Sequence, residues 1–385
     1  MSNVHVWAPD LFSTGGIQAF SRHFIAALNG IARSDEIRVL LKNDLPRVVQ
    51  RRGDFDRAMT FGHWPSILRT TRFTSECAAR GWHERPRFIA SLHLNFGPVA
   101  QLLKELIKVP YVVVAHGIDT WRLQEGARTK ALHKADLVLA VSHYTRDWLV
   151  QKLGLDAERV QILPNTFLPQ RFSIGGKSPK LLQRYGLTPR TRVILTVCRL
   201  AGAERYKGYD QMIRALPQIL QHVPDTRYLL VGTGPDRLRI EKLVAELNLR
   251  DAVIFGGHVS DDELAEHYNL CDLFAMPSKA EGFGIVYLEA LACGKPVLAG
   301  NRDGSRDALA NGDLGLLVDP DDTAEIALET IRVLQRQHTH PKLFHPELLR
   351  ESAKELFGFD VFKRKLKEKL GRFMENDGGQ RTADH

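Results

Sequence analysis

The chain has 385 residues, of which 44% are hydrophobic and 25% charged, with a formal net charge of +8; this composition is typical of a globular protein and excludes a disordered or fibrous chain. Its four cysteines form no Cys-x-x-Cys pair, which excludes a disulfide scaffold or zinc ribbon and fits a reducing cytosol. No apolar run approaches the roughly 18 residues of a membrane helix, and the first 30 residues resemble no signal peptide, so we expect a cytoplasmic protein.

Short apolar runs alternate with longer amphipathic stretches in the first half. A strand at residues 4–7 is followed by Gly15-Gly16 and by a helix at about residues 17–30. Further strands are predicted at residues 37–41, 88–92, 111–115, 137–141 and 160–163. Because helices separate several of these strands, the pattern predicts a parallel sheet covered by helices.

A second winding follows the polar segment at residues 173–180, whose Gly and Pro residues are typical of a domain boundary. Its strands are predicted at residues 193–197, 228–231, 253–255, 273–276 and 296–299. Its helices are predicted near residues 208–222, 236–248, 261–270 and 284–293, with a helical tail at about 347–373. We therefore predict two doubly wound, Rossmann-like α/β domains, at residues 1–172 and 173–362. Ligands of such sheets bind beyond the carboxyl ends of the strands, so a cleft between the halves is the expected site.

The positive charge is confined to one half of the chain. Residues 1–172 carry a net charge of +8, whereas residues 173–385 carry none. A basic half suggests an acidic partner, either an anionic lipid surface or a pyrophosphate-bearing substrate. A solvated surface with a chance imbalance is the alternative. Nucleic acid is not expected as a partner, because no known binding module is recognisable.

The segment after the strand at residues 273–276 is the most informative. Gly282 and Gly284 lie in a strand-to-helix turn, where they permit positive φ and close approach of a ligand. The amides that begin the helix form a candidate diphosphate site; they belong to Phe283, Gly284 and Ile285. Glu281 and Glu289 are candidates for gripping sugar and ribose hydroxyls as charged acceptors. The alternative is a loop with two glycines and a solvated carboxylate.

Two cations follow the strand at residues 193–197. Arg199 lies just past the strand end and Lys207 just before a helix. Together they can neutralise a diphosphate as it departs. Taken alone, an arginine at a strand end is more often a surface or ion-pair residue.

Two weaker motifs lie in the first half. Gly15-Gly16 lets backbone amides approach a phosphate, although it lacks the full Gly-x-Gly-x-x-Gly pattern and a plain turn is the alternative. His116 follows the strand at residues 111–115 and precedes a glycine. An imidazole there is either structural or functional.

Taken together, these pieces resemble family 4 of the retaining, nucleotide-sugar-dependent glycosyltransferases, which have the GT-B fold. The resemblance covers most of the chain, is specific in the second half and is diffuse between residues 30 and 110. The matching pieces are Gly15-Gly16, His116-Gly117, Pro164-Asn165, Arg199…Lys207-Gly208, Val231–Pro235, Glu281-x7-Glu289, Leu298–Gly304 and Gly315–Pro320.

The resemblance implies a role for each matching residue. Arg199 and Lys207 would hold the donor diphosphate. Further donor-binding groups implied by the family pattern come from Gly15, Gly16, Gly232, Gly282, Phe283, Gly284 and Ile285. Glu281 would contact donor-sugar hydroxyls, and His116 would lie near the C6 hydroxyl. Contacts to the nucleoside are implied for Glu289 at the ribose and for Val259 and Leu264 beside the base. The segment between Arg199 and Lys207 is longer than in many relatives.

The implied activity is transfer of a hexose with retention, without a covalent enzyme intermediate. No metal or other cofactor is expected, because Arg199 and Lys207 supply the positive charge. A UDP-hexose is the favoured donor and GDP-mannose the next. The acceptor is expected to be a sugar, plausibly lipid-diphosphate-linked and part of a surface polysaccharide, met at the cytoplasmic face of a membrane. The helix at about 363–385 is expected to pack back on the first domain. Two alternatives are an epimerase of the same fold that hydrolyses its donor and a catalytically silent nucleotide-sugar-binding subunit.

Overall fold

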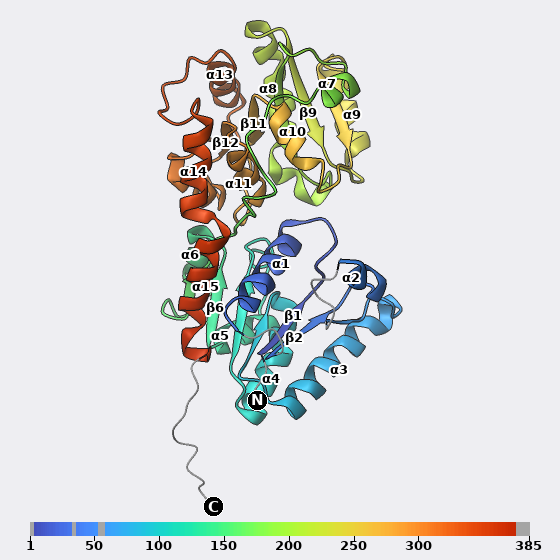
Figure 1. Ribbon diagram of the computed structural model, residues 1–385, viewed down its shortest axis with the longest axis vertical. Helices are drawn as coiled ribbons and strands as arrows, with labels where there is room; N and C mark the ends of the chain where they lie inside the picture. Colours follow the sequence, from blue (N-terminus) through green and yellow to red (C-terminus); the bar gives the residue numbers. More distant parts are fainter. Residues whose placement is uncertain (1–3, 33–35, 53–57, 375–385) are drawn as a thin grey trace, which may run out of the picture. The chain divides into compact units, whose positions relative to one another are not determined.

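The computed structural model describes residues 4–32, 36–52 and 58–374. The chain divides into two compact units (Figure 1). Unit 1 comprises Met1–Leu163 together with Asp360–His385, and unit 2 comprises Pro164–Phe359. All strand pairs in both units are parallel.

Unit 1 is built on a seven-stranded sheet in the order β3-β2-β1-β4-β5-β6-β7. Its strands are β1 (Val4–Ala8), β2 (Ile37–Leu41), β3 (Met59–Thr60), β4 (Phe88–Ser91), β5 (Tyr111–Ala115), β6 (Leu137–Ala140) and β7 (Val160–Ile162). In the register, Val6 of β1 lies opposite Val39 of β2 and Ala90 of β4. Its helices are α1 (Gly16–Asn29), α2 (Pro46–Arg52), α3 (Ser66–Glu84), η2 (Leu94–Phe96), α4 (Gly97–Ile107), α5 (Ala127–Lys134), α6 (His143–Gln151) and, from the end of the chain, α15 (Phe359–Met374).

Unit 2 is built on a six-stranded sheet in the order β10-β9-β8-β11-β12-β13. Its strands are β8 (Arg192–Val197), β9 (Thr226–Val231), β10 (Val253–Gly257), β11 (Leu273–Met276), β12 (Val297–Gly300) and β13 (Leu316–Val318). Leu195 of β8 lies opposite Leu229 of β9 and Phe274 of β11. Its helices are α7 (Pro179–Arg184), η3 (Gly202–Lys207), α8 (Tyr209–His222), α9 (Arg237–Glu246), α10 (Leu264–Leu270), α11 (Ile285–Ala292), α12 (Ser305–Ala308), η4 (Ala310–Gly312), α13 (Thr323–Leu334) and α14 (Pro346–Phe357).

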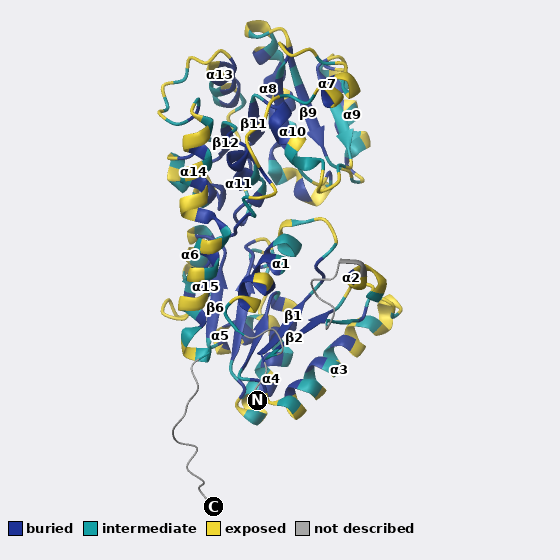
Figure 2. Ribbon diagram, in the orientation of Figure 1, coloured by how far each residue is buried: buried dark blue, intermediate teal, exposed yellow. Residues whose placement is uncertain are grey.

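The central strands are buried in both units, as Figure 2 shows. All residues of β5 and of β11 are buried. Helices that cover both faces of a parallel sheet leave no strand face to solvent, so these strands are continuous apolar runs. The prediction of two Rossmann-like α/β sheets is confirmed.

The strands expected from the sequence are all present, with ends that differ by at most two residues. The strands β3 and β13 were not expected. Each has only two or three residues and forms an edge of its sheet. So short a run lies below the four to eight residues by which an apolar strand is recognised in a sequence.

The tail is two helices instead of one. Gly358 separates α14 from α15, with extended backbone at φ −61° and ψ 158°, and it pairs with Phe167. The chain passes from unit 2 to unit 1 just after this break. Within unit 1, Phe362 of α15 is buried and packs edge-on against Phe20, with ring centroids 5.7 Å apart.

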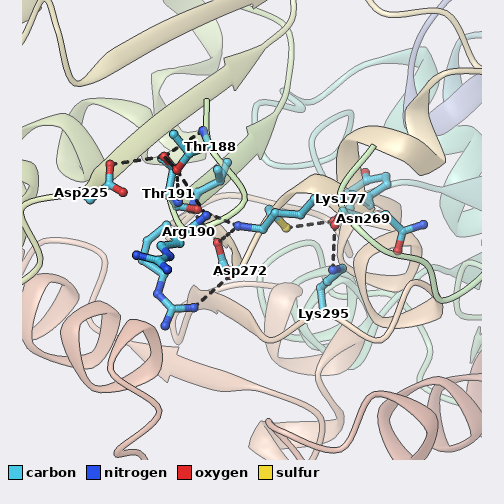
Figure 3. Close-up of polar contacts among 12 residues, drawn as sticks. Lys177, Thr188, Arg190, Thr191, Asp225, Asn269, Asp272 and Lys295 are labelled. Atoms are coloured by element: carbon cyan, nitrogen blue, oxygen red, sulfur yellow. Dashed lines mark hydrogen bonds and ion pairs between the residues drawn. The ribbon is translucent and has the colours of Figure 1, made fainter. Parts of the chain in front are cut away.

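The boundary between the units precedes the polar segment at residues 173–180 instead of coinciding with it. That segment is fastened to the start of β8 (Figure 3). Lys177 Nζ donates to Asp272 Oδ2 and to the carbonyl of Thr191, both at 2.7 Å, and Asp272 also accepts from the Val193 amide. These contacts attach residues 173–180 to unit 2. Their Gly- and Pro-containing composition therefore belongs to a surface segment of unit 2 and does not mark the boundary between the units.

Candidate functional site

The sheet order of unit 2 reverses between β8 and β11. The strands β9 and β10 lie on one side of this pair, and β12 and β13 lie on the other. In open parallel sheets such a reversal leaves room for a ligand beyond the carboxyl ends of the strands. Arg199 and Lys207 follow β8, and Glu281 follows β11. These residues of the second half thus follow adjacent central strands and lie at the edge of the sheet formed by the carboxyl ends of its strands.

Four charged side chains form a cluster at this edge. Lys207 Nζ lies 2.9 Å from Glu281 Oε2 and 3.9 Å from Glu204 Oε2. The other oxygen of Glu204 forms an ion pair with the Arg199 guanidinium. Two cations and two carboxylates balance, so the cluster has no formal net charge in this structure.

Lys207 is the buried member of the two cations. Its side chain is 15% exposed, whereas that of Arg199 is 62% exposed. Burial, the largest single influence, disfavours the charged ammonium, but the groups around it, with the Glu281 carboxylate foremost, together outweigh burial, so the pKa of Lys207 is raised above its usual value. Lys207 is therefore a permanent positive charge held in place by Glu281.

The turn from β11 to α11 leaves three backbone donors without a partner among the described residues. Gly284 has φ 86° and ψ 80°, in the left-handed region, and a Cβ there would lie 2.3 Å from the Tyr287 ring. The side chains of Phe283 and Ile285 are buried, so only their backbone can meet a ligand. The amides of residues 283–285 donate no hydrogen bond to any residue that the structure describes. Unpaired amides at a helix start favour an anion.

A buried carboxylate fixes this turn. Asp303, which is fully buried after β12, accepts hydrogen bonds from the Glu281 amide at 2.6 Å and from Ser278 Oγ at 2.7 Å. It also accepts one from the Ser305 amide at 2.9 Å. In return, the carbonyl of Glu281 accepts from the Gly304 amide at 2.9 Å. Both backbone groups of Glu281 are thus held by the segment that follows β12. Burial raises the pKa of Asp303 to about 6.

Replacing Asp303 with asparagine should loosen this turn and remove a pH dependence. The asparagine side chain has one oxygen fewer and would point N–H groups at the donors that Asp303 now accepts from. The turn that carries Glu281 would lose its fixed position, so turnover should fall. The pKa of the Asp303 carboxyl rises from 3.8 to about 6 on folding. Between these two pH values the folded wild type therefore binds more protons than the unfolded chain, so the contribution of Asp303 to the free energy of unfolding falls as the pH rises. The difference in unfolding free energy between wild type and D303N, from urea titrations, should decrease from pH 4 to pH 6. A difference that does not vary with pH would contradict this account.

The remaining predicted residues of unit 2 lie at the same edge or just inside it. Glu289, in α11, accepts a hydrogen bond from the Tyr268 hydroxyl at 2.7 Å. Gly232 follows β9, and a Cβ there would lie 1.8 Å from the carbonyl of Cys198, so close backbone packing by itself requires this glycine. Val259 and Leu264 are half-buried beyond the end of β10.

The predicted residues of unit 1 follow β1 and β5. Gly15 precedes α1 and Gly16 begins it; a Cβ at Gly16 would meet no atom within 4 Å. His116 Nε2 lies 2.9 Å from the carbonyl of Leu92, which can only accept, so Nε2 carries the proton. Burial lowers the pKa of His116 to about 4. The imidazole is therefore neutral, and Nδ1 is an acceptor.

Three further carboxylates at these sites were missed by the sequence analysis. They are Glu204, Asp303 and Asp119, and each belongs to a segment that the motifs already contained. Asp119 accepts from the His116 amide at 2.9 Å, and burial raises the pKa of its carboxyl to about 7. Its Oδ2 is buried and has no partner among the described residues. The sequence did offer a signal for these residues. A carboxylate repels a phosphate, so an acidic residue inside a phosphate-binding segment must have another role.

The described residues contain no group of three or more His, Cys, Asp or Glu side chains placed to hold a metal ion.

Comparison with known proteins identifies both halves. Residues 178–347 match the family model "Glycosyl transferases group 1", and residues 15–166 match "Glycosyl transferase 4-like domain". A GDP-mannose-dependent alpha-(1-6)-phosphatidylinositol monomannoside mannosyltransferase from Mycolicibacterium smegmatis is 34% identical over 56% of this chain. Its counterpart from Mycobacterium tuberculosis is 37% identical over 48% of this chain. The chain spans 58% and 49% of these two relatives.

Solved structures match nearly the whole chain. Sucrose-phosphate synthase from Thermosynechococcus elongatus gives a TM-score of 0.81 at 21% identity, covering 97% of this chain and 99% of its own. HepE from Anabaena, solved in complex with UDP, gives 0.79 at 22% identity, with 97% and 100% coverage. These similarities establish a shared two-domain fold.

Proposed function

Because the chain belongs to glycosyltransferase family 4 and has the GT-B fold, we propose that it transfers a hexose from a nucleoside-diphosphate sugar to a sugar acceptor with retention of configuration. The observation that carries the proposal is the cluster after β8 and β11. Two cations, and three amides that have no partner among the described residues, lie at one edge of the sheet, where a diphosphate needs positive partners.

Each group has a distinct task in the proposed reaction. Arg199, Lys207 and the amides of residues 283–285 bind the diphosphate and stabilise the charge that grows on it as the sugar departs. Glu281 accepts hydrogen bonds from donor-sugar hydroxyls, and the neutral Nδ1 of His116 accepts one more. The bond between the anomeric carbon and the diphosphate oxygen breaks, and the acceptor hydroxyl oxygen bonds to that carbon from the same face while its proton passes to the departing diphosphate. Configuration is therefore retained without a covalent enzyme intermediate.

The relatives favour GDP-mannose as the donor over the UDP-hexose preferred in the sequence analysis. The two mycobacterial-type relatives, at 34% and 37% identity, are named as GDP-mannose-dependent. UDP is suggested by HepE, which was solved with UDP and with UDP-glucose but is only 22% identical to this chain. We propose GDP-mannose as the first donor to test and UDP-glucose as the second.

The matching nucleoside diphosphate should stabilise the protein against heat. A ligand that binds only the folded state adds about 2.7 kcal/mol when present at one hundred times its dissociation constant. Thermal melts with GDP, UDP and ADP should therefore show a clear rise in Tm for one base and a smaller rise for the others. The sugar conjugate of that base is then supplied with candidate acceptors, and the anomeric configuration of the product is read by NMR. Donor consumed without acceptor and released as an epimerised sugar would instead support an epimerase. No rise with any nucleotide would contradict the proposal.

We propose further that the acceptor is lipid-linked and that unit 1 docks on an anionic membrane surface. Unit 1, with the α15 segment, carries a formal charge of +9, while unit 2 carries −1. Basic residues near an anionic leaflet are worth about 1 kcal/mol each. The name of the mycobacterial-type relatives includes a phosphatidylinositol mannoside. Within the described residues, no helix is both long enough and apolar enough to cross a membrane.

A further inference from the structure

Glu204 occupies the position between the two cations that the proposed function assigns to a diphosphate. It lies in η3, between Arg199 and Lys207 in the sequence, and its side chain is only 10% exposed. One carboxylate oxygen is paired with the Arg199 guanidinium, and the other lies 3.9 Å from Lys207 Nζ. A carboxylate that bridges two cations makes the contacts that a phosphate group would make.

The two cations differ in how firmly they are held. Lys207 keeps a second carboxylate, Glu281, at 2.9 Å, and its side chain is mostly buried. The Arg199 side chain is 62% exposed, which leaves its guanidinium room to change partner. An exchange of anions at this site therefore involves Arg199 and Glu204 more than Lys207 and Glu281.

The backbone around Glu204 is anchored independently of this ion pair. The Tyr209 hydroxyl lies 3.2 Å from the carbonyl of Ala201 and 2.8 Å from Asp236 Oδ2. The Asp236 amide donates to the carbonyl of Leu200 at 2.9 Å. Asp236 is in turn held by Arg239, whose Nη2 lies 2.6 Å away. With its main chain fixed in this way, Glu204 can move by side-chain rotation alone.

Charge balance makes such a movement necessary. The cluster is neutral with Glu204 in place, and a nucleoside diphosphate brings at least two negative charges to it. Leaving a buried carboxylate beside the incoming phosphates would set like charges close together in a poorly screened site.

We propose that Glu204 is an internal substitute for the diphosphate, which neutralises Arg199 while the donor site is empty and is displaced when the donor binds. This inference rests on the proposed function. Glu204 lowers the affinity for both donor and product, because each must compete with a carboxylate already in place. After transfer it re-forms its pair with Arg199, which helps to expel the nucleoside diphosphate.

The test is the affinity of the E204Q variant for inorganic pyrophosphate, UDP and GDP, measured by titration calorimetry. Glutamine has the same size but no charge, so it cannot compete for Arg199, and binding should be about tenfold tighter, which corresponds to about 1.4 kcal/mol. The matched control is E241Q, which removes the same charge from an exposed pair with Arg237 on α9 of unit 2. Its affinities should equal those of the wild type.

The opposite outcome would overturn the inference. If E204Q binds all three probes as weakly as the wild type or more weakly, Glu204 orients Arg199 instead of competing for it. The E204D variant, which keeps the charge but is one methylene shorter, gives a second reading and should bind with intermediate affinity. A wild type that binds pyrophosphate but neither nucleotide would count against the proposed function. A wild type that binds a nucleotide with E204Q unchanged would count against the role of Glu204 alone.

Discussion

The K207A variant is expected to lose both nucleoside diphosphate binding and turnover. Lys207, the last residue of η3, is a mostly buried permanent cation, and alanine would leave Glu204 and Glu281 close together without a positive charge between them. Loss of one preorganised group that stabilises developing charge costs about 10²–10³-fold in turnover. We expect a loss of that size in kcat/KM, with the dissociation constant for the nucleoside diphosphate raised in parallel, as measured by steady-state kinetics and calorimetry.

The control for this variant is K242A, because Lys242 is an exposed lysine of α9 in the same unit. It should bind and turn over as the wild type does. Thermal melts of both variants separate a local effect from unfolding. A K207A protein that melts like the wild type and still binds the nucleotide normally would refute the assignment of Lys207 to the diphosphate.

The E281Q variant is expected to separate turnover from nucleotide binding. Glu281 is assigned to the sugar, while the diphosphate is assigned to the amides of residues 283–285, which the substitution leaves in place. Its loss also frees Lys207 from a carboxylate 2.9 Å away. Turnover should fall by about 10²-fold, the effect of losing one strong charge-assisted contact to the reacting sugar. The affinity for the nucleoside diphosphate without its sugar should be unchanged or higher.

Turnover is measured by steady-state kinetics with the complete donor, and the affinity for the nucleoside diphosphate is measured by calorimetry with the nucleotide alone. E241Q again controls for the lost charge. If E281Q weakened nucleotide binding as much as turnover, Glu281 would belong to the diphosphate site or to the folding of its turn, and the division of labour proposed here would be wrong.

The fold could be predicted from the sequence because its strands are long enough to be recognised. A strand buried on both faces, such as β5 or β11, is a continuous apolar run bounded by polar residues, and the helices between the strands make the sheet parallel. The edge strands β3 and β13 lacked this signal because they are only two or three residues long. The break at Gly358 was missed for a related reason, since α14 and α15 are both amphipathic and adjoin with one residue between them.

The amino-acid sequence by itself determined which residues follow which strands, and therefore that Arg199, Lys207 and Glu281 lie at one edge of a parallel sheet. Only the tertiary structure decided how their charges pair. The sequence shows how many carboxylates there are but not which of them forms an ion pair with a cation. That pairing depends on the path of η3 and of the segment after β12. The bridging of both cations by Glu204 arises within one segment, because the path of η3 brings Glu204 back to Arg199 and Lys207. The fixing of the Glu281 backbone by Asp303 is a contact between the segments that follow β11 and β12. Both depend on the three-dimensional path of the backbone, which no spacing of residue types in the sequence specifies.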